Sequence, residues 1–388
     1  MRSIGLYPQR GIIHACLNLP LTVHFNFKMM IPLKTILTFS FLLSLFVGIN
    51  NIYANPGDEP SSKIGMVAFT VKANQAYEFS EGLALIKIDN KAGFIDARGV
   101  MVIKPTFDNA ESFSQHLAVA KLGGKYGYID KTGNWAIPPR YDHAESFKEG
   151  MACVLIGESR GFINKQGKLL FSNPMIAGLF AFSEGMLRIR QGWETPLTAK
   201  NGFLNHQGNV QIHPIYDHVE AFSEGLASVR LGSNPDNALD LGKSGYIDKH
   251  GKMLIEPQYE EAGSFREGLA YVRINKKFGY IDKKGKMIIP AQFDSAYSFS
   301  EGFAAVAIGN TYGFINHQGT LVIKPQFSWV LPFKQGLAGI EASSNQGFGF
   351  IDRKGNIVVK PAFSEIGNYS HDLAPARTGN AEWSYLFR

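Results

Sequence analysis

The chain has 388 residues, and its 39 lysines and arginines face 33 aspartates and glutamates. Four of these bases and none of the acids lie in the first 54 residues, so 35 bases face 33 acids in the remainder, a balance that argues against a nucleic-acid partner. Of the two cysteines, Cys16 lies in that first segment, which leaves Cys153 alone and excludes an intrachain disulfide or a cysteine-based metal site in the rest.

The first 54 residues show the pattern of a leader segment. Residues 1–29 have no helix or strand pattern and are predicted to be an unstructured leader or a mis-assigned gene start. In residues 30–54, Lys34 precedes an apolar stretch at 35–49, and the small residue Ala54 stands before Asn55, as in a secretory signal peptide. The alternative is an uncleaved membrane anchor, although a spanning helix needs about 20 apolar residues. We expect an exported protein, periplasmic, at the cell surface or extracellular, with no membrane span after cleavage.

Residues 55–75 form a linker that ends in a partial repeat strand, and residues 76–388 consist of tandem repeats. An aromatic residue opens each copy, at spacings of 34 to 43 residues: Phe79, Phe113, Phe147, Phe182, Phe222, Phe265, Phe299, Phe333 and Tyr369. Each of the eight full copies contains three β-type runs, which in the first copy are residues 83–88, 93–96 and 100–104. A copy this short cannot bury enough apolar surface to fold alone, so neighbouring copies must share a core.

A turn of fixed sequence joins the second and third runs of every full copy. Asp or Asn stands first and Gly follows three positions later, as in Asp96 and Gly99. The first side chain can accept backbone N–H groups, and glycine can take the left-handed conformation that closes the hairpin. Proline follows six residues after the glycine in six copies, as at Pro105, and marks either the end of the third strand or a sheet edge.

These features predict an all-β fold, a tandem array of about eight to nine three-stranded antiparallel units. The array either closes as a β-propeller-like ring or winds as an open β-solenoid. The ninth copy stops at residues 383–388 after two β-runs, while residues 65–71 form a β-run in the place of a third strand. Because the two fragments add up to one unit, we favour the ring.

The pattern resembles the bacterial WG-repeat proteins over about residues 76–388. The shared motifs are E-G-L/M/F, G-Y/F-I/L, the D/N-x-x-G turn and the Pro-x-aromatic that follows it. That family is named for Trp-Gly, whereas the residues before the second-run glycine here are Ala92, Tyr126, Arg160, Asn201, Ser244, Phe278, Tyr312 and Phe348. The resemblance implies a β-rich scaffold used in exported or surface contexts, and it brings no catalytic activity with it.

Recurring polar residues are interpreted first as structural. One row of glutamates has a glycine after each member: Glu81, Glu149, Glu184, Glu224, Glu267 and Glu301. These carboxylates either bind cations or a basic partner, or they accept backbone N–H groups in turns. We favour the second interpretation. The D/N-x-x-G turns supply one side-chain ligand each, too few for calcium. His206, His250 and His317 are interpreted as solvated turn residues, and Cys153 as a core residue. Known catalytic motifs are missing, so we predict neither an enzyme nor a cofactor or metal site.

Loop length sets copies four and five apart from the others. Their connections between the first two β-runs are the longest and lie in adjacent copies, at residues 191–201 and 232–244. We take them as candidate ligand-binding loops, with these side chains as contacts: Trp193, Glu194, Asn234, Asp236, Asn237 and Asp240. The alternative is tolerated surface insertion, because a long loop closes at little extra entropic cost.

The predicted function is non-catalytic binding or scaffolding in the bacterial cell envelope or exterior, with an unknown protein or glycan as partner. The alternative is a structural envelope component that assembles with itself. A glycan-acting enzyme would need two acids that converge in a pocket outside the D/N-x-x-G turns.

Overall fold

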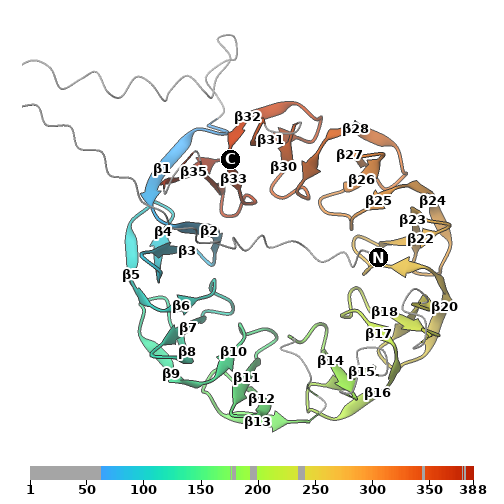
Figure 1. Ribbon diagram of the computed structural model, residues 1–388, viewed down its shortest axis with the longest axis horizontal. Coiled ribbons are helices and arrows are strands. Elements are labelled where there is room, and N and C mark those ends of the chain that lie inside the picture. Colours follow the sequence, from blue (N-terminus) through green and yellow to red (C-terminus); the bar gives the residue numbers. More distant parts are fainter. Residues whose placement is uncertain are drawn as a thin grey trace, which may run out of the picture. The chain divides into compact units, whose positions relative to one another are not determined.

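The computed structural model describes residues 63–174, 176, 181–192, 199–234, 241–342, 346–377, 379 and 382–388. These residues form strands and turns, and none of them belongs to a helix long and apolar enough to span a membrane. The strands build nine antiparallel sheets arranged as a ring (Figure 1). The predicted all-β class and the ring are therefore confirmed. We call each sheet a blade and number the blades along the chain from residue 75.

Blade 1 shows the pattern that the other blades repeat. It contains β2 (Gln75–Ser80), β3 (Leu83–Ile88), β4 (Lys91–Asp96) and β5 (Met101–Phe107), paired in that order from the inner to the outer side of the ring (Figure 1). The last three strands correspond to the three predicted runs. The prediction of three strands per unit is wrong, because β2 adds an inner fourth strand. In seven later blades this strand has only two residues, too few to show an alternating pattern.

The remaining strands take the same four places. The inner strands are β6 (Asn109–Ala110), β10 (His143–Ala144), β17 (His218–Val219), β21 (Glu261–Ala262), β25 (Ser295–Ala296), β29 (Trp329–Val330) and β33 (Glu365–Ile366). The second strands are β7 (Ala118–Leu122), β11 (Ala152–Ile156), β14 (Met186–Gln191), β18 (Leu226–Leu231), β22 (Leu269–Ile274), β26 (Ala304–Ile308), β30 (Leu337–Glu341) and β34 (Leu373–Arg377). In blade 4 the described residues give three strands, which begin with β14.

The third and outer strands complete the blades. The third strands are β8 (Lys125–Ile129), β12 (Ser159–Ile163), β15 (Lys200–Asn205), β19 (Lys243–Asp248), β23 (Lys277–Asp282), β27 (Thr311–Ile315), β31 (Phe348–Asp352) and β35 (Glu382–Phe387). The outer strands are β9 (Trp135–Tyr141), β13 (Leu169–Ser172), β16 (Val210–Tyr216), β20 (Met253–Tyr259), β24 (Met287–Phe293), β28 (Leu321–Phe327), β32 (Ile357–Phe363) and, in blade 9, β1 (Val67–Lys72).

Blade 9 joins the two ends of the repeat region. Its outer strand β1 comes from the N-terminal side and pairs with the C-terminal strand β35, so that Lys72 lies opposite Glu382 and Val67 opposite Leu386. The order of the sheet is β33, β34, β35 and β1 from inside to outside. The prediction that the two end fragments add up to one unit is confirmed.

Side-chain contacts across this closure are the same as those between other blades. The ring of Tyr385 in blade 9 lies 5.2 Å from that of Phe79 in blade 1, as the ring of Phe94 lies 4.9 Å from that of Phe113. Ser370 Oγ donates a hydrogen bond to the carbonyl of Phe79 at 2.7 Å, the bond that the serines of several other blades make to the next one. The interface between blades 9 and 1 therefore closes the ring as an ordinary interface between neighbours.

The hydrophobic core lies between blades. One cluster combines Leu85, Phe94 and Ile103 of blade 1 with Phe113 and Ile129 of blade 2, all of them buried. The other clusters likewise combine residues of neighbouring blades, including one that joins blade 9 to blade 1. A blade keeps its apolar side chains from water only when its neighbour is present, which explains why a single repeat cannot fold alone.

The repeated glycine and proline meet where the third and outer strands pair. Pro105 lies inside β5, the outermost strand of its blade, so it marks the sheet edge rather than the strand end. The register shifts at Gly93, and a Cβ atom there would lie 2.6 Å from the carbonyl oxygen of Ile103 and 2.7 Å from the nitrogen of Pro105. Only glycine allows the outer backbone to approach this closely.

The D/N-x-x-G turns have the predicted conformation. In the first copy, Asp96 Oδ1 accepts the backbone N–H groups of Arg98 and Val100, each at 2.9 Å, and Gly99 N–H donates to the carbonyl of Asp96 at 2.9 Å. The φ angle of Gly99 is +79°, and those of the corresponding glycines in the other seven full copies lie between +74° and +86°. Both parts of the prediction, the acceptor side chain and the left-handed glycine, are confirmed.

Candidate ligand pocket at the ring closure

The six glutamates that precede a glycine form a row that links neighbouring blades. Their carboxylates accept backbone N–H groups from the equivalent turn of the next blade. Glu301, for example, accepts the N–H of Gly336 at 2.7 Å. The turn interpretation is confirmed, with the correction that the donors lie in the next copy. The glutamates also have positive φ angles themselves.

Each glutamate of this row also meets a basic side chain from the next blade's D/N-x-x-G turn: Lys131, His206, Lys249, Lys283, His317 and Arg353. His206 Nε2 lies 3.0 Å from Glu149 and His317 Nε2 lies 3.2 Å from Glu267. Both histidines stand in turns and are partly exposed, as expected of solvated turn residues, and each in addition pairs with a carboxylate of the preceding blade. His250 is exposed, as predicted.

These contacts set the pKa values of the row. Burial tends to raise the pKa of Glu301, but the N–H donors of Gly336 and Gln335 and the guanidinium of Arg353 outweigh it, so that the pKa lies below its usual range. Glu184 and Glu224 show the same direction, and there the lysine of the next blade acts with the backbone donors. The row thus binds bases of its own chain.

A second set of acids serves the opposite end of the blades. Asp108, in the link between β5 and β6, accepts the backbone N–H of Gly123 at 2.9 Å and pairs with Lys91 at 2.7 Å. Asp142 and Asp294 hold the corresponding turns of their blades in the same way. The glutamate row and these aspartates are therefore engaged in holding turns.

The predicted ligand loops fall mostly outside the residues that the structure describes. This applies to Trp193, Glu194, Asp236, Asn237 and Asp240. Asn234 is described and is exposed, just beyond β18. The two loops connect the second and third strands of adjacent blades, β14 to β15 and β18 to β19, so they begin at the same end of neighbouring blades.

Cys153 is a core residue, as predicted. Its side chain is buried in β11 among the residues packed between blades 3 and 4. Burial raises the pKa of the thiol to about 12, with a further contribution from Glu145. Because the thiolate is the reactive form, this cysteine is unsuited to nucleophilic chemistry at neutral pH.

Glu145, which directly follows β10, shows the opposite electrostatic behaviour to the glutamate row, and Glu111 directly follows β6 in the adjacent blade. Burial and the neighbouring charge of Glu111 raise the pKa of Glu145 to about 7. Glu111 accepts a hydrogen bond from Ser146 Oγ at 2.7 Å, while His143 Nδ1 lies 3.7 Å from Glu145. Glu145 therefore gains or loses its proton near neutral pH.

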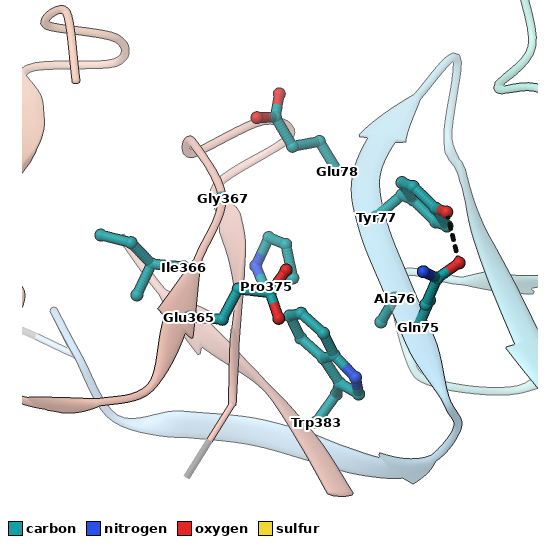
Figure 2. Close-up of a pocket in the computed structure, with 9 residues that line it drawn as sticks. All are labelled: Gln75, Ala76, Tyr77, Glu78, Glu365, Ile366, Gly367, Pro375 and Trp383. Carbon is teal, nitrogen blue, oxygen red and sulfur yellow. Dashed lines mark hydrogen bonds between the residues drawn. The ribbon is translucent and has the colours of Figure 1, made fainter. Parts of the chain in front are cut away.

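A pocket of about 200 Å³ lies at the closure between blades 9 and 1. Blade 1 contributes four residues of β2, and blade 9 contributes residues of β33, β34 and β35 together with the glycine after β33 (Figure 2). The lining residues are Gln75, Ala76, Tyr77, Glu78, Glu365, Ile366, Gly367, Pro375 and Trp383. The pocket therefore exists only because the chain ends meet there.

The two carboxylates of the pocket have different surroundings. Glu78 Oε1 accepts the backbone N–H of Asn368 at 2.8 Å and its Nδ2 at 3.0 Å, and Lys334 Nζ lies 3.1 Å from Glu78 Oε2. The side chain of Glu365 is 58 % exposed, and Arg377 Nη1 lies 3.7 Å from its carboxylate, beyond hydrogen-bond distance. Glu365 is therefore the carboxylate with acceptor capacity left for a ligand.

The aromatic residues of the pocket supply polar atoms as well. Tyr77 donates its hydroxyl to Gln75 Oε1 at 2.8 Å, and burial, with Glu365 nearby, raises the pKa of Tyr77. Trp383 is 3 % exposed, and its Nε1 has no hydrogen-bond partner among the described residues. Figure 2 shows this nitrogen on the side of the indole that faces Gln75 and Ala76. A buried donor without a partner costs about 1–3 kcal/mol, so the pocket favours a ligand that supplies an acceptor.

Comparison with known families identifies the repeat. Eight segments match the family described as WG containing repeat: residues 74–91, 93–126, 126–158, 202–234, 245–278, 278–312, 312–342 and 348–380. Together they cover more than half of the chain. The chain belongs to the WG-repeat family.

Solved structures resemble the WG-repeat ring at low sequence identity. A eukaryotic initiation factor aligns with a TM-score of 0.55 and 11% identity, over 81% of this chain and 90% of that chain. The computationally designed Ika8 protein gives a TM-score of 0.44 and 11% identity over 71% and 95% of the two chains, and AztD from Citrobacter koseri gives 0.36 and 16% over 74% and 86%. The likeness to the initiation factor supports the fold alone. No curated protein matches the chain.

The tryptophan after which the WG-repeat family is named occurs here in the ninth copy. Trp383 pairs with Arg377 as Ala92 pairs with Lys87, which places it before the position of the second-run glycine, where Ser384 stands. Sequence reasoning missed the pocket because this copy ends there and the aligned dipeptide is Trp-Ser. The usable signal was a tryptophan at that one position of the repeat.

Proposed function

We propose that this WG-repeat ring is a non-catalytic binding or scaffold protein of the cell envelope or exterior. The observation that carries the proposal is the pocket at the ring closure, which contains a buried indole N–H without a partner among the described residues and a solvent-accessible carboxylate. The glutamate row, Asp96 and Asp108 are by contrast committed to turns and neighbouring blades. A ring that carries this pocket suits recognition of a partner.

The environment of the pocket acids favours binding over catalysis. A glycoside hydrolase uses two carboxyl groups, one of which keeps its proton because it lies in apolar surroundings. In this pocket Glu78 contacts Lys334 and Glu365 lies near Arg377. The two acids converge in one pocket, as an enzyme would require, but each faces a base.

The test is capture of a partner from envelope fractions by the immobilised full chain. Glu365→Phe places an apolar ring at the mouth of the pocket. Glu261→Phe is the matched control, because Glu261 occupies the equivalent position of the inner strand in blade 6 and its carboxylate also lies 3.7 Å from an arginine. We expect the wild type and the control to retain the partner and Glu365→Phe to lose it. Equal capture by the two variants would place binding elsewhere, and release of cleaved product by the wild type would contradict a non-catalytic role.

The predicted loops in copies four and five are a second place where a partner could bind. Shortening residues 191–201 and 232–244 to the length found in the other copies, and repeating the capture, tests them separately from the pocket. Loss of the partner from this variant alone would assign binding to the loops.

Export is proposed on the pattern of residues 30–54. Protein recovered outside the cytoplasm should begin at Asn55, and mass spectrometry of its N-terminal peptide measures this. Intact Met30 in that material would show that the segment is retained as an anchor.

A self-assembling structural component is the second candidate, favoured by apolar side chains on the outer strands. Val102, Leu170, Leu254, Ile288 and Val322 are all exposed there, on strands whose outer edges can pair with another chain. Analytical ultracentrifugation separates the candidates. A single-chain mass at high concentration contradicts assembly, whereas oligomers that disperse in Leu254→Lys support it.

A further inference from the structure

We infer that the pocket at the ring closure binds one neutral, hydroxyl-bearing ring, the size and chemistry of a single sugar unit of a glycan. This inference rests on the proposed binding function and names its ligand class. It is argued from the volume of the pocket, from the hydrogen-bonding atoms that remain available, and from the apolar side chains between them.

The volume limits the ligand to one ring. The pocket measures about 200 Å³. A cavity of about 150 Å³ is known to accept a benzene molecule, whereas pockets for larger ligands usually exceed about 300 Å³. One six-membered ring therefore fits, and a longer chain would have to continue outside the pocket.

The available polar atoms demand a ligand that both accepts and donates. Trp383 Nε1–H needs an acceptor. The exposed Glu365 carboxylate can accept from a donor, and the hydroxyl oxygen of Tyr77 can accept because its proton is directed to Gln75. A hydroxyl group can satisfy both demands, and a ring that carries several can do so at once.

Other ligand classes fail one of these demands. Lysine and arginine side chains have no acceptor for the indole N–H. An anion such as a carboxylate has no donor for the Glu365 carboxylate. A purely apolar ring would leave the N–H of Trp383 unpaired and would desolvate Glu365 without a donor.

Apolar side chains complete the fit to a sugar. Ile366 and Pro375 line the blade 9 side of the pocket, and Ala76 lines the blade 1 side (Figure 2). The C–H surfaces of a pyranose can pack against them while its hydroxyl groups reach the polar atoms. The open side, where Glu365 is exposed, leaves room for the rest of a glycan chain.

Saturation-transfer NMR on the full chain tests the inference, with glucose, galactose, mannose and N-acetylglucosamine as probes at millimolar concentration. At least one probe should receive saturation. Glu365→Gln replaces a charged acceptor by a weaker neutral one, and Trp383→Phe removes the indole N–H, so each variant should bind the probe about tenfold more weakly. The matched control Glu261→Gln removes the same kind of carboxylate in blade 6 and should bind as the wild type does.

The results separate the sugar assignment from the proposed function. If none of the probes binds but the envelope partner is still lost from Glu365→Phe, the binding function stands and the sugar assignment is overturned. If a probe binds equally to Glu365→Gln and Glu261→Gln, the assignment to this pocket is overturned. Should Trp383→Phe fail to fold, Glu365→Gln still decides, because that side chain is mostly exposed.

Discussion

Replacing Gly285 with valine should destabilise the ring for two separate reasons. Gly285 closes the turn between β23 and β24 with a φ angle of +79°, which a β-branched residue strongly disfavours. A Cβ atom there would also lie 3.3 Å from Cγ2 and 3.4 Å from Cγ1 of Ile255, a buried residue of the preceding blade. The variant therefore strains its own turn and presses on the interface between blades 5 and 6.

The two effects can be given approximate sizes. A side chain forced into a positive φ angle costs about 1–3 kcal/mol. Crowding a packed core adds about 1–3 kcal/mol. Gly285→Val should therefore lower the free energy of unfolding by about 2–6 kcal/mol.

Gly268 provides the matched control for the crowding effect. Its φ angle is +82°, close to that of Gly285, but a Cβ atom at this position would have no heavy atom within 4 Å. Gly268→Val should therefore show the backbone cost of about 1–3 kcal/mol alone. The difference between the two variants measures the contact with Ile255.

Urea unfolding followed by tryptophan fluorescence gives both values from the midpoint and slope of the transition. A wild-type midpoint for Gly285→Val would refute the turn conformation described above. Equal losses in the two glycine variants would instead show that the contact with Ile255 contributes nothing to stability.

Three further predictions concern the glutamates and the ring closure. Glu301→Ala should lower the free energy of unfolding by about 1–2 kcal/mol near neutral pH. Because the pKa of Glu301 is lowered in the folded state, the urea midpoints of the variant and the wild type should approach each other as the pH falls below about 4.3. A gap that stays constant with pH would contradict this. The pKa of Glu145 is raised in the folded state, so the wild type loses stability as the pH rises from about 4.3 to 7. Glu145→Gln should therefore match the stability of the wild type at acidic pH and exceed it at pH 8. Equal urea midpoints at pH 8 would exclude the raised pKa. Deleting residues 382–388 removes the strand that pairs with β1. Limited proteolysis followed by mass spectrometry should then show early cleavage within residues 67–72. Continued protection of this segment would mean that other contacts hold β1.

The repeat itself and its local turns could be predicted from the sequence, because they depend on residues close together in the chain. Asp96 and Gly99 stand three positions apart, and the hydrogen bonds that they form stay within that turn. The short apolar run at residues 83–88 likewise predicts a strand without knowledge of its neighbours. The match of the two end fragments favoured the ring as well, because each fragment could be recognised as part of a repeat from its own sequence.

Only the tertiary structure could decide the features that join distant residues. The inner strand of most blades has two residues and exists only through its pairing with the next strand. The glutamate row looked like a set of independent turns, but Glu149 reaches Gly185 in the next blade, and spacing alone does not reveal such a bond.

The pocket shows the same limit most clearly. Gln75 and Trp383 stand at opposite ends of the repeat region, and they face each other only because β1 pairs with β35. Periodicity along the chain describes what every copy shares. The closure brings together the two ends of the chain, so periodicity does not show that the side chains of the pocket meet there, and the packing of blade 9 against blade 1 decides what they line.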